Sequence, residues 1–220
     1  MCTRYISPEA GDIERQWHVG GRSPMRWVQD VFPNYQGPFF RAARDSTSFE
    51  RELVVGQWSL IPWFAKERKL KFPTNNARSE ELSAKASYKQ PWARGQRCII
   101  PAESFFEPCW ETGKHVPWQF RRADGEQWGL AGLWNIWIDK ATGEVVESYT
   151  MLTINADAHP LMNRMHRPDP KRPPNMQDKR SVVPIEMTDV NLWLTAPIEQ
   201  ASALVRLAPV ELFDAAPAKG

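Results

Sequence analysis

The sequence contains few of the residues and motifs that mark secreted, membrane-spanning or metal-dependent proteins. Its cysteines, Cys2, Cys98 and Cys109, are an odd set that does not favour a disulfide framework. No CxxC or HxxxH pair offers zinc ligands, and no Walker loop, GxGxxG or GxSxG motif is present. No apolar run reaches the roughly 18 residues of a membrane span, and the N-terminus lacks an apolar signal segment. We therefore predict a cytoplasmic protein that uses no metal or cofactor and does not enter the membrane.

The net charge is low, but basic residues are unevenly distributed along the chain. The formal net charge is only +2, whereas residues 66–97 hold nine Lys/Arg against three Asp/Glu and residues 163–180 hold six against two. Basic segments are commonly no more than solvated surface. Eleven tryptophans are also present. Most belong in the core, but a few beside basic residues could stack on nucleic-acid bases.

The hydrophobic pattern predicts one α+β domain built on antiparallel strands. Residues 53–61 are apolar and β-branched, and they predict a buried strand that ends at Pro62. Residues 118–122, 129–138 and 144–155 predict three further strands joined by tight turns. We expect further strands over 97–102, 104–106 and 180–185. Short helices are expected after Ser7-Pro8, from Ser79 to about Tyr88, and after Thr188 or Asp189. Residues 31–48 read as irregular, and the last residues as a frayed tail.

The segment 163–180 has four prolines and no hydrophobic period. It predicts a long exposed loop, and such loops in compact domains are usually functional or disordered.

Cys2 has the most distinctive potential chemistry. Removal of Met1 would leave a terminal cysteine with both an α-amine, pKa about 7.7 to 8.0, and a thiol, pKa about 8.5. The amine can condense with an aldehyde to a Schiff base, and the thiol can then close a thiazolidine ring. The open form of an abasic deoxyribose presents such an aldehyde. The alternative is that Cys2 is an ordinary terminal residue.

Two further groups of polar residues could serve such a site. Glu107 follows two phenylalanines, so desolvation would raise its pKa and suit it to acid–base work; the alternative is a surface glutamate at a strand end. Asn76 and Arg78 precede a predicted helix, where Arg78 could clamp a phosphate and Asn76 could bind a sugar or the terminal amine. Loop capping is the alternative. Either His159 or His166 could relay protons.

Several segments, taken in chain order, resemble the SOS-response-associated peptidase (SRAP) family of abasic-site sensors. They cover most of the chain: Met1-Cys2-x-Arg4, Trp58-Ser-Leu-Ile-Pro62-Trp63, Asn76-Ala-Arg78-x-Glu80, Arg97-Cys98 through Phe106-Glu107, Gly129-Leu-Ala-Gly-Leu-Trp134, and Thr153 through His166. Each segment alone is weakly specific, whereas their common order is strongly so.

The resemblance implies a compact, barrel-like α+β domain over residues 1–213, with residues 214–220 as a tail and a basic groove for single-stranded DNA. It assigns the nucleophile to Cys2, polar contacts near the adduct to Asn76, and acid–base work to Glu107. His166, rather than His159, would assist the Schiff-base and ring-opening steps.

The resemblance also implies DNA contacts away from the nucleophile. Arg4 and Arg78 would bind phosphates, and Trp63 with Phe64 would form an apolar wedge beside the lesion. Either Arg167 or Arg180 would be the arginine that follows the histidine in the family.

Three departures from the family pattern stand out. Thr3 replaces the usual glycine, and an Asn-x-Ala-Pro segment is reduced to Pro33-Asn34-Tyr35. The family's short His-x-Arg-Met-Pro run is interrupted here, so that residues 167–179 lie between His166 and Arg180 as an apparent insertion.

The function that the resemblance implies is covalent capture of abasic sites in single-stranded DNA through Cys2, by a monomer that associates with the nucleoid when bound to DNA. Autoproteolysis and Schiff-base lyase activity are corollaries. The alternatives are a thiol peptidase that uses Cys2, and a non-catalytic single-stranded DNA-binding module.

Overall fold

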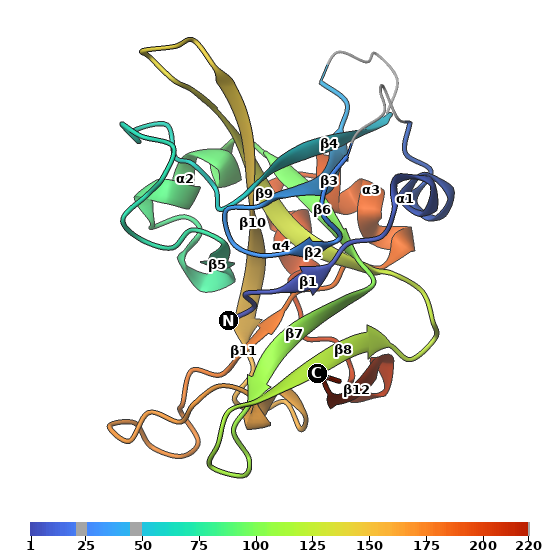
Figure 1. Cartoon of the computed structure of the whole chain (residues 1–220), viewed down its shortest axis with the longest axis vertical. Coiled ribbons are helices and arrows are strands. Elements are labelled where there is room, and N and C mark those ends of the chain that lie inside the picture. The colour runs from blue at the N-terminus through green and yellow to red at the C-terminus, as the bar shows by residue number, and fades with distance from the viewer. Residues whose placement is uncertain (21–25, 45–49, 220) are drawn as a thin grey trace.

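A closed ring of five strands forms the centre of the structure, a computed structural model that describes residues 1–20, 26–44 and 50–219 (Figure 1). The ring strands are β3 (Gln36–Ala42), β4 (Arg51–Trp58), β6 (Arg97–Ala102), β9 (Trp128–Ile138) and β10 (Val145–Asn155). The order is β10-β4-β3-β6-β9, and the ring closes because β9 also pairs with β10. Only the β10–β4 pair in this ring is parallel. Closure leaves these strands without an open edge.

A second sheet lies beside the ring and carries the N-terminus (Figure 1). Its order is β12-β8-β7-β1-β2, with all neighbours antiparallel. Its strands are β1 (Tyr5–Ile6), β2 (Asp30–Val31), β7 (Ser104–Cys109), β8 (Val116–Arg122) and β12 (Phe213–Pro217). Two short strands also join β10: β5 (Asn76–Arg78), which is parallel to it, and β11 (Arg180–Val182), which is antiparallel.

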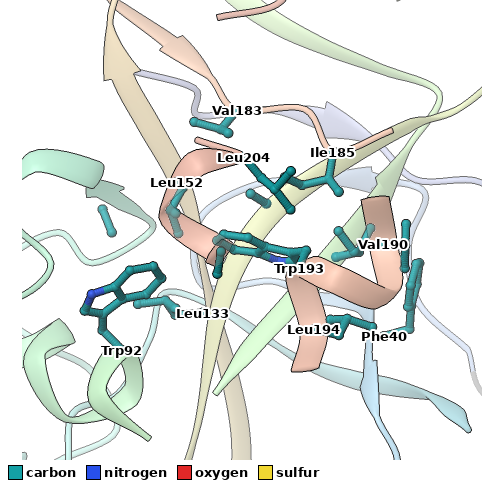
Figure 2. Close-up of a cluster of buried hydrophobic side chains, with 14 of the residues drawn as sticks. Phe40, Trp92, Leu133, Leu152, Val183, Ile185, Val190, Trp193, Leu194 and Leu204 are labelled. Atoms are coloured by element: carbon teal, nitrogen blue, oxygen red, sulfur yellow. The ribbon is translucent and has the colours of Figure 1, made fainter. Parts of the chain in front are cut away.

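In the part of the chain that the structure describes, four short helices flank the sheets: α1 (Ala10–Trp17), α2 (Ala86–Ala93), α3 (Val190–Thr195) and α4 (Ile198–Ala203). Figure 2 shows a buried cluster in which Trp193 of α3 lies among aliphatic side chains from several ring strands. The Trp193 indole N–H donates to the Cys98 carbonyl at 2.9 Å, which ties α3 to β6. No helix in the described residues is long and apolar enough to cross a membrane.

A second buried cluster occupies the opposite face of the ring strands and includes the N-terminus. Phe39 and Phe40 are neighbours on β3 but belong to different clusters, as the alternation of side chains along a strand requires. Phe39 joins Tyr5, Tyr149 and Cys2, which are all fully buried. The first residues of the chain are therefore part of the core rather than a free end.

The prediction of a single α+β domain with an antiparallel, barrel-like core is confirmed, as are the strands predicted over 97–102, 118–122, 129–138 and 144–155. The predicted strand 104–106 extends to Cys109. The predicted strand 180–185 is shorter, ending at Val182.

Several local predictions are wrong. Residues 31–48 are not irregular throughout, since β2 and β3 lie there; positions 45–48 fall outside the described residues. The helix expected from Ser79 is a single 3-10 turn, and α2 begins only at Ala86. The tail expected to fray contains β12, which pairs with the otherwise open edge of β8. Ser7 does not cap α1, whose N-cap is Glu9.

The predicted loop 163–180 begins with the 3-10 turn η2 (Met162–Arg164) and returns to the sheet at β11. It is the orange segment that projects beside the β7–β8 hairpin in Figure 1. Most of it is exposed, but Met165, Lys179 and Arg180 are buried.

Candidate functional site

The N-terminus is held in an extended conformation along β7. The Phe106 amide donates to the Arg4 carbonyl at 3.0 Å and the Glu103 amide donates to the Ile6 carbonyl at 2.8 Å. Because side chains alternate along an extended chain, Met1 and Thr3 are exposed whereas Cys2 is fully buried. Thr3 therefore points away from the core, and its replacement of the family's glycine does not crowd the thiol.

Two asparagines hold the backbone of Cys2. The Asn76 side-chain amide donates to the Cys2 carbonyl at 2.6 Å, and that of Asn75 donates at 3.2 Å. Their positions follow from β5, which pairs with Met151 and Leu152 of β10. The sequence pattern indicated Asn76 but not Asn75, although the two are adjacent.

Glu107 projects from β7 toward the terminal amine. It is 2% exposed, and its Oε2 lies 3.5 Å from the Met1 amine and 2.7 Å from the His166 Nε2. The Met1 amine also contacts His166 Nε2 directly. Burial by itself raises the pKa of Glu107, but the terminal amine and His166 outweigh burial and hold that pKa below its ordinary value. The expectation of a raised pKa is therefore wrong while the cationic terminus is present.

His166 adopts a left-handed backbone conformation, with φ at 61°. Its amide donates to the Pro108 carbonyl at 2.7 Å, so its main chain is anchored to the residue that follows Glu107. Non-glycine residues in this region are strained by about 1 to 3 kcal/mol, and such strain collects at functional sites. The sequence predicted the histidine, but it gave no sign of its backbone geometry.

Three buried polar atoms at this site have no hydrogen-bond partner within the described ranges. They are Asn76 Oδ1, Glu107 Oε1 and His166 Nδ1. Most buried polar atoms in proteins are paired, so these unpaired atoms are places where a ligand group or an ordered water can bond. The cluster therefore has free capacity to accept or donate hydrogen bonds beside the terminus.

The thiol of Cys2 is protonated in this structure. Burial, reinforced by the negative charge of Glu107, raises its pKa to about 12. The Sγ atom lies 3.3 Å from the Arg4 carbonyl, which accepts its weak hydrogen bond. A thiol in this environment is a poor nucleophile by itself, since the thiolate is the reactive form.

His159 has a structural role. It is 5% exposed, its Nδ1 accepts hydrogen bonds from the Leu161 and Met162 amides at 3.1 and 3.0 Å, and its Nε2 contacts the Ala208 carbonyl at 2.9 Å. Since Nδ1 accepts, Nε2 is the ring nitrogen that donates to the Ala208 carbonyl. Of the two histidines considered, the structure brings only His166 to Glu107.

The predicted phosphate contacts Arg4 and Arg78 are half-exposed, and both are engaged with carboxylates. Arg4 forms a bidentate pair with Asp30 at 2.8 and 2.9 Å and lies 4.2 Å from the ring centroid of Phe106. Arg78 contacts Asp178 of the inserted loop at 2.7 Å.

The two candidates for the arginine after the histidine differ in exposure. Arg167 is exposed, with its guanidinium 5.5 Å from the Trp110 ring centroid. Arg180 has a side chain that is 5% exposed, and it contacts Glu80 at 2.8 Å and Asp178 at 3.2 Å. A DNA contact by Arg180 would require these ion pairs to open, whereas Arg167 is accessible as it stands.

The predicted wedge residues lie on the surface. Trp63 is 64% exposed and Phe64 is 40% exposed, and their rings meet edge to face with centroids 5.8 Å apart. An exposed aromatic pair is unusual in a monomer and offers stacking surface.

Two surface hollows are each lined by a residue at or next to the N-terminal segment. One is lined by residues that include Arg4, Phe106 and Arg121. The other is lined by residues that include Asn75, Lys71 and Phe72. Each therefore combines basic and aromatic side chains and reaches a residue that contacts the first four positions of the chain.

Within the described ranges, no cluster of His, Cys, Asp and Glu has the arrangement of a metal site. Sequence reasoning missed Lys179, whose buried ammonium binds the Met165 and His166 carbonyls. It stands in a basic run whose composition suggests solvated surface, and only the fold reveals its burial.

Comparison with known proteins matches the chain to one family over almost its whole length. The family model described as SOS response associated peptidase (SRAP) matches residues 1–218. A Xenopus tropicalis protein named abasic site processing protein HMCES is 32% identical over 189 residues, covering 75% of this chain and 56% of that protein. A Bacillus subtilis protein named abasic site processing protein YoqW is 34% identical over 113 residues, covering 50% of this chain and 48% of that protein. The chain thus spans about half the length of these curated relatives.

Solved structures share the fold over the whole chain. A crystal structure of a Bordetella bronchiseptica protein has a TM-score of 0.86 and 34% identity, covering 99% of this chain and 100% of that one. A Bacteroides thetaiotaomicron protein has a TM-score of 0.76 with 20% identity, covering 100% of this chain and 92% of that one; the likeness concerns the fold alone.

Proposed function

Because the chain belongs to the SOS response associated peptidase (SRAP) family, we propose that it processes abasic sites in DNA by covalent capture through Cys2 after loss of Met1. The observation that carries the proposal is that Glu107 and His166 contact the terminal amine while Asn76 holds the carbonyl of the fully buried Cys2. The names of the curated relatives support the same substrate.

The reaction begins at the α-amine that Met1 removal exposes on Cys2. The amine adds to the C1 aldehyde of the open abasic sugar, giving a carbinolamine that loses water to become an imine. The Cys2 S–H then adds across the C=N bond: sulfur bonds to carbon, the proton passes to nitrogen, and a thiazolidine ring closes. One water is released overall.

Glu107 and His166 are positioned to move the protons that these steps require. Loss of water from the carbinolamine needs a proton donated to the leaving hydroxyl, and attack needs a neutral amine. In the structure both side chains already contact the terminal amine of Met1. Two hydrogen-bonded titratable groups can supply a proton in one step and accept a proton in the other.

Met1 occupies the space that the sugar would use. Met1 is 43% exposed, and its amine contacts both Glu107 and His166. While Met1 is attached, the nitrogen of Cys2 is an amide and cannot form an imine. Loss of Met1 both creates the nucleophile and vacates the place beside the proton-transfer pair.

Single-stranded DNA would approach across the surface that carries Trp63, Phe64 and Arg78. Stacking on exposed aromatics contributes about 1 to 3 kcal/mol per base, and phosphate contacts make binding salt-dependent. The protein acts as a monomer in this proposal, with the adduct shielding the lesion from strand cleavage.

The test is incubation with a single-stranded oligonucleotide that contains one abasic site, followed by a denaturing gel and intact mass measurement. The wild-type protein should give a stable adduct whose mass is the sum of DNA and Met1-less protein minus one water. Cys2→Ala keeps a terminal amine but lacks sulfur, so it should form no stable ring. Cys98→Ala removes a different buried thiol and should react like wild type. An equally stable adduct from Cys2→Ala would overturn the mechanism.

The thiol peptidase alternative would use the same buried Cys2 thiol as its nucleophile, so the two functions are separated by their products. Peptide cleavage that depends on Cys2, in the absence of any DNA adduct, would favour that reading. Binding of intact DNA without any adduct would favour the non-catalytic module. Strand cleavage at the abasic site would reveal Schiff-base lyase activity.

A further inference from the structure

A buried lysine lies beneath the histidine of the site. The Lys179 ammonium donates to the Met165 carbonyl at 2.6 Å and to the His166 carbonyl at 2.5 Å, and the residue is only 6% exposed. Lys179 ends the inserted segment 167–179, which begins directly after His166. One side chain therefore closes this long loop onto the residue from which it starts.

The geometry at His166 depends on this closure. Two consecutive carbonyls normally point in different directions, and they converge here because Met165 is extended whereas His166 is left-handed, with φ at 61°. A left-handed histidine is unfavourable by itself, so surrounding contacts must hold it. The Pro108 carbonyl accepts from the His166 amide on one side, and Lys179 binds the His166 carbonyl on the other.

Lys179 is itself held rigidly. The Asp157 carboxylate accepts hydrogen bonds from the backbone amides of Asp178 and Lys179 at 3.0 and 2.8 Å. The Lys179 carbonyl accepts from the Ala156 amide at 2.7 Å. The ammonium is therefore presented from a fixed main chain next to β11 rather than from a loose loop.

We propose that Lys179 is a positioning residue that fixes the left-handed backbone of His166 and so holds the imidazole against Glu107 for proton transfer. This inference rests on the function proposed above. Lys179 does not touch the DNA in this role, since its ammonium is buried against two carbonyls. The inserted segment serves to bring this lysine back to the histidine.

The experiment compares two single substitutions that remove the same charge from the same loop. Lys179→Met removes the buried ammonium, and Lys171→Met removes an exposed one near the loop tip. Single-turnover adduct formation on abasic single-stranded DNA gives a rate at saturation and a dissociation constant for each. We expect Lys179→Met to lower the saturated rate at least tenfold while its dissociation constant stays within twofold of that of Lys171→Met. Lys179→Arg, whose guanidinium can donate to both carbonyls, should recover part of the rate.

A second readout does not require chemistry on DNA. The ring-proton NMR shifts of His166 should move in Lys179→Met and return toward wild type in Lys179→Arg, whereas those of the exposed His115 should not move. If the wild-type protein forms no adduct, the proposed function fails, yet these shifts still test the positioning role. If Lys179→Met does not fold, Lys179→Gln takes its place in both measurements. A folded variant with the wild-type rate and unmoved His166 shifts would overturn the inference.

Discussion

The two hydrogen bonds on the Cys2 carbonyl allow a quantitative test of how the terminus is held. Asn76→Ala removes the 2.6 Å bond and leaves the 3.2 Å bond from Asn75, whereas Asn75→Ala does the reverse. The double substitution removes both. Asn191→Ala is a matched control on α3, because that asparagine accepts from Arg51 rather than contacting the terminus.

The magnitude follows from the burial of Cys2. A typical net hydrogen bond contributes about 0.5 to 1.5 kcal/mol, and a buried carbonyl left without a donor costs about 1 to 3 kcal/mol. Each single variant leaves one donor in place, so we expect a loss of about 1 kcal/mol in the population of the reactive arrangement, or about fivefold in rate. The double variant leaves the buried carbonyl bare and should be slower than the product of the two single effects.

The assay is the saturated single-turnover rate of adduct formation, with the fraction of protein that has lost Met1 measured by intact mass in each variant. Rates are compared per mole of processed protein, so that a processing defect is not mistaken for a chemical one. Asn76→Ala should be slower than Asn75→Ala, because it loses the shorter bond and the unpaired Oδ1. Wild-type rates in both single variants, or simple multiplication in the double variant, would refute the reasoning.

Three other perturbations have expected outcomes that follow from the packing and charge described above. The pKa of Glu107 is lower in the folded protein than its ordinary value of 4.5. The carboxylate therefore stabilises the fold above pH 4.5, and this contribution is lost as the pH falls through the folded pKa. In urea unfolding at decreasing pH, the free energy of unfolding should fall less steeply in Glu107→Gln than in the wild type, and equal slopes against pH would contradict this. Trp193→Ala should lower the free energy of unfolding by about 3 to 5 kcal/mol, because it leaves a cavity in the cluster of Figure 2 and removes the hydrogen bond to the Cys98 carbonyl. Urea or thermal unfolding measures this loss, and a value below about 1 kcal/mol would show that the cluster repacks. A Cβ at Gly132 would lie 2.7 Å from the Thr150 carbonyl oxygen and 2.9 Å from the Cys98 sulfur, so Gly132→Ala should cost about 1 to 3 kcal/mol in the same assay, and an unchanged midpoint would contradict the crowding.

The strands that the sequence predicts correctly are those whose own residues specify them. Residues 128–138 and 145–155 are rich in β-branched and aromatic side chains and meet at a short turn, so local preference and tertiary pairing agree. The missed strand β3 contains Gly37 and Pro38, which disfavour a strand locally. It forms because β4 and β6 flank it on both sides, and that pairing is decided by residues far along the chain.

The site likewise contains residues that the sequence points to and residues that only the fold reveals. Cys2, Glu107 and His166 are chemically distinctive, and their order along the chain resembles a known family, so the sequence singles them out as candidates. Asn75 and Lys179 instead donate hydrogen bonds to backbone carbonyls of other residues. The pattern of side chains along a sequence does not indicate which carbonyl a donor will contact. The prediction of a raised pKa for Glu107 is wrong for a related reason, because the groups that outweigh its burial lie at the N-terminus and at His166, 59 residues along the chain.

The burial of the Cys2 thiol affects how readily this sulfur is oxidised or alkylated. Peroxides and alkylating agents consume thiolates far faster than protonated thiols, and they need access to the sulfur. A sulfur with no exposed surface and a pKa of about 12 is screened on both counts. Under the proposed function each Cys2 reacts only once, so this screening would preserve the thiol until it meets an abasic site.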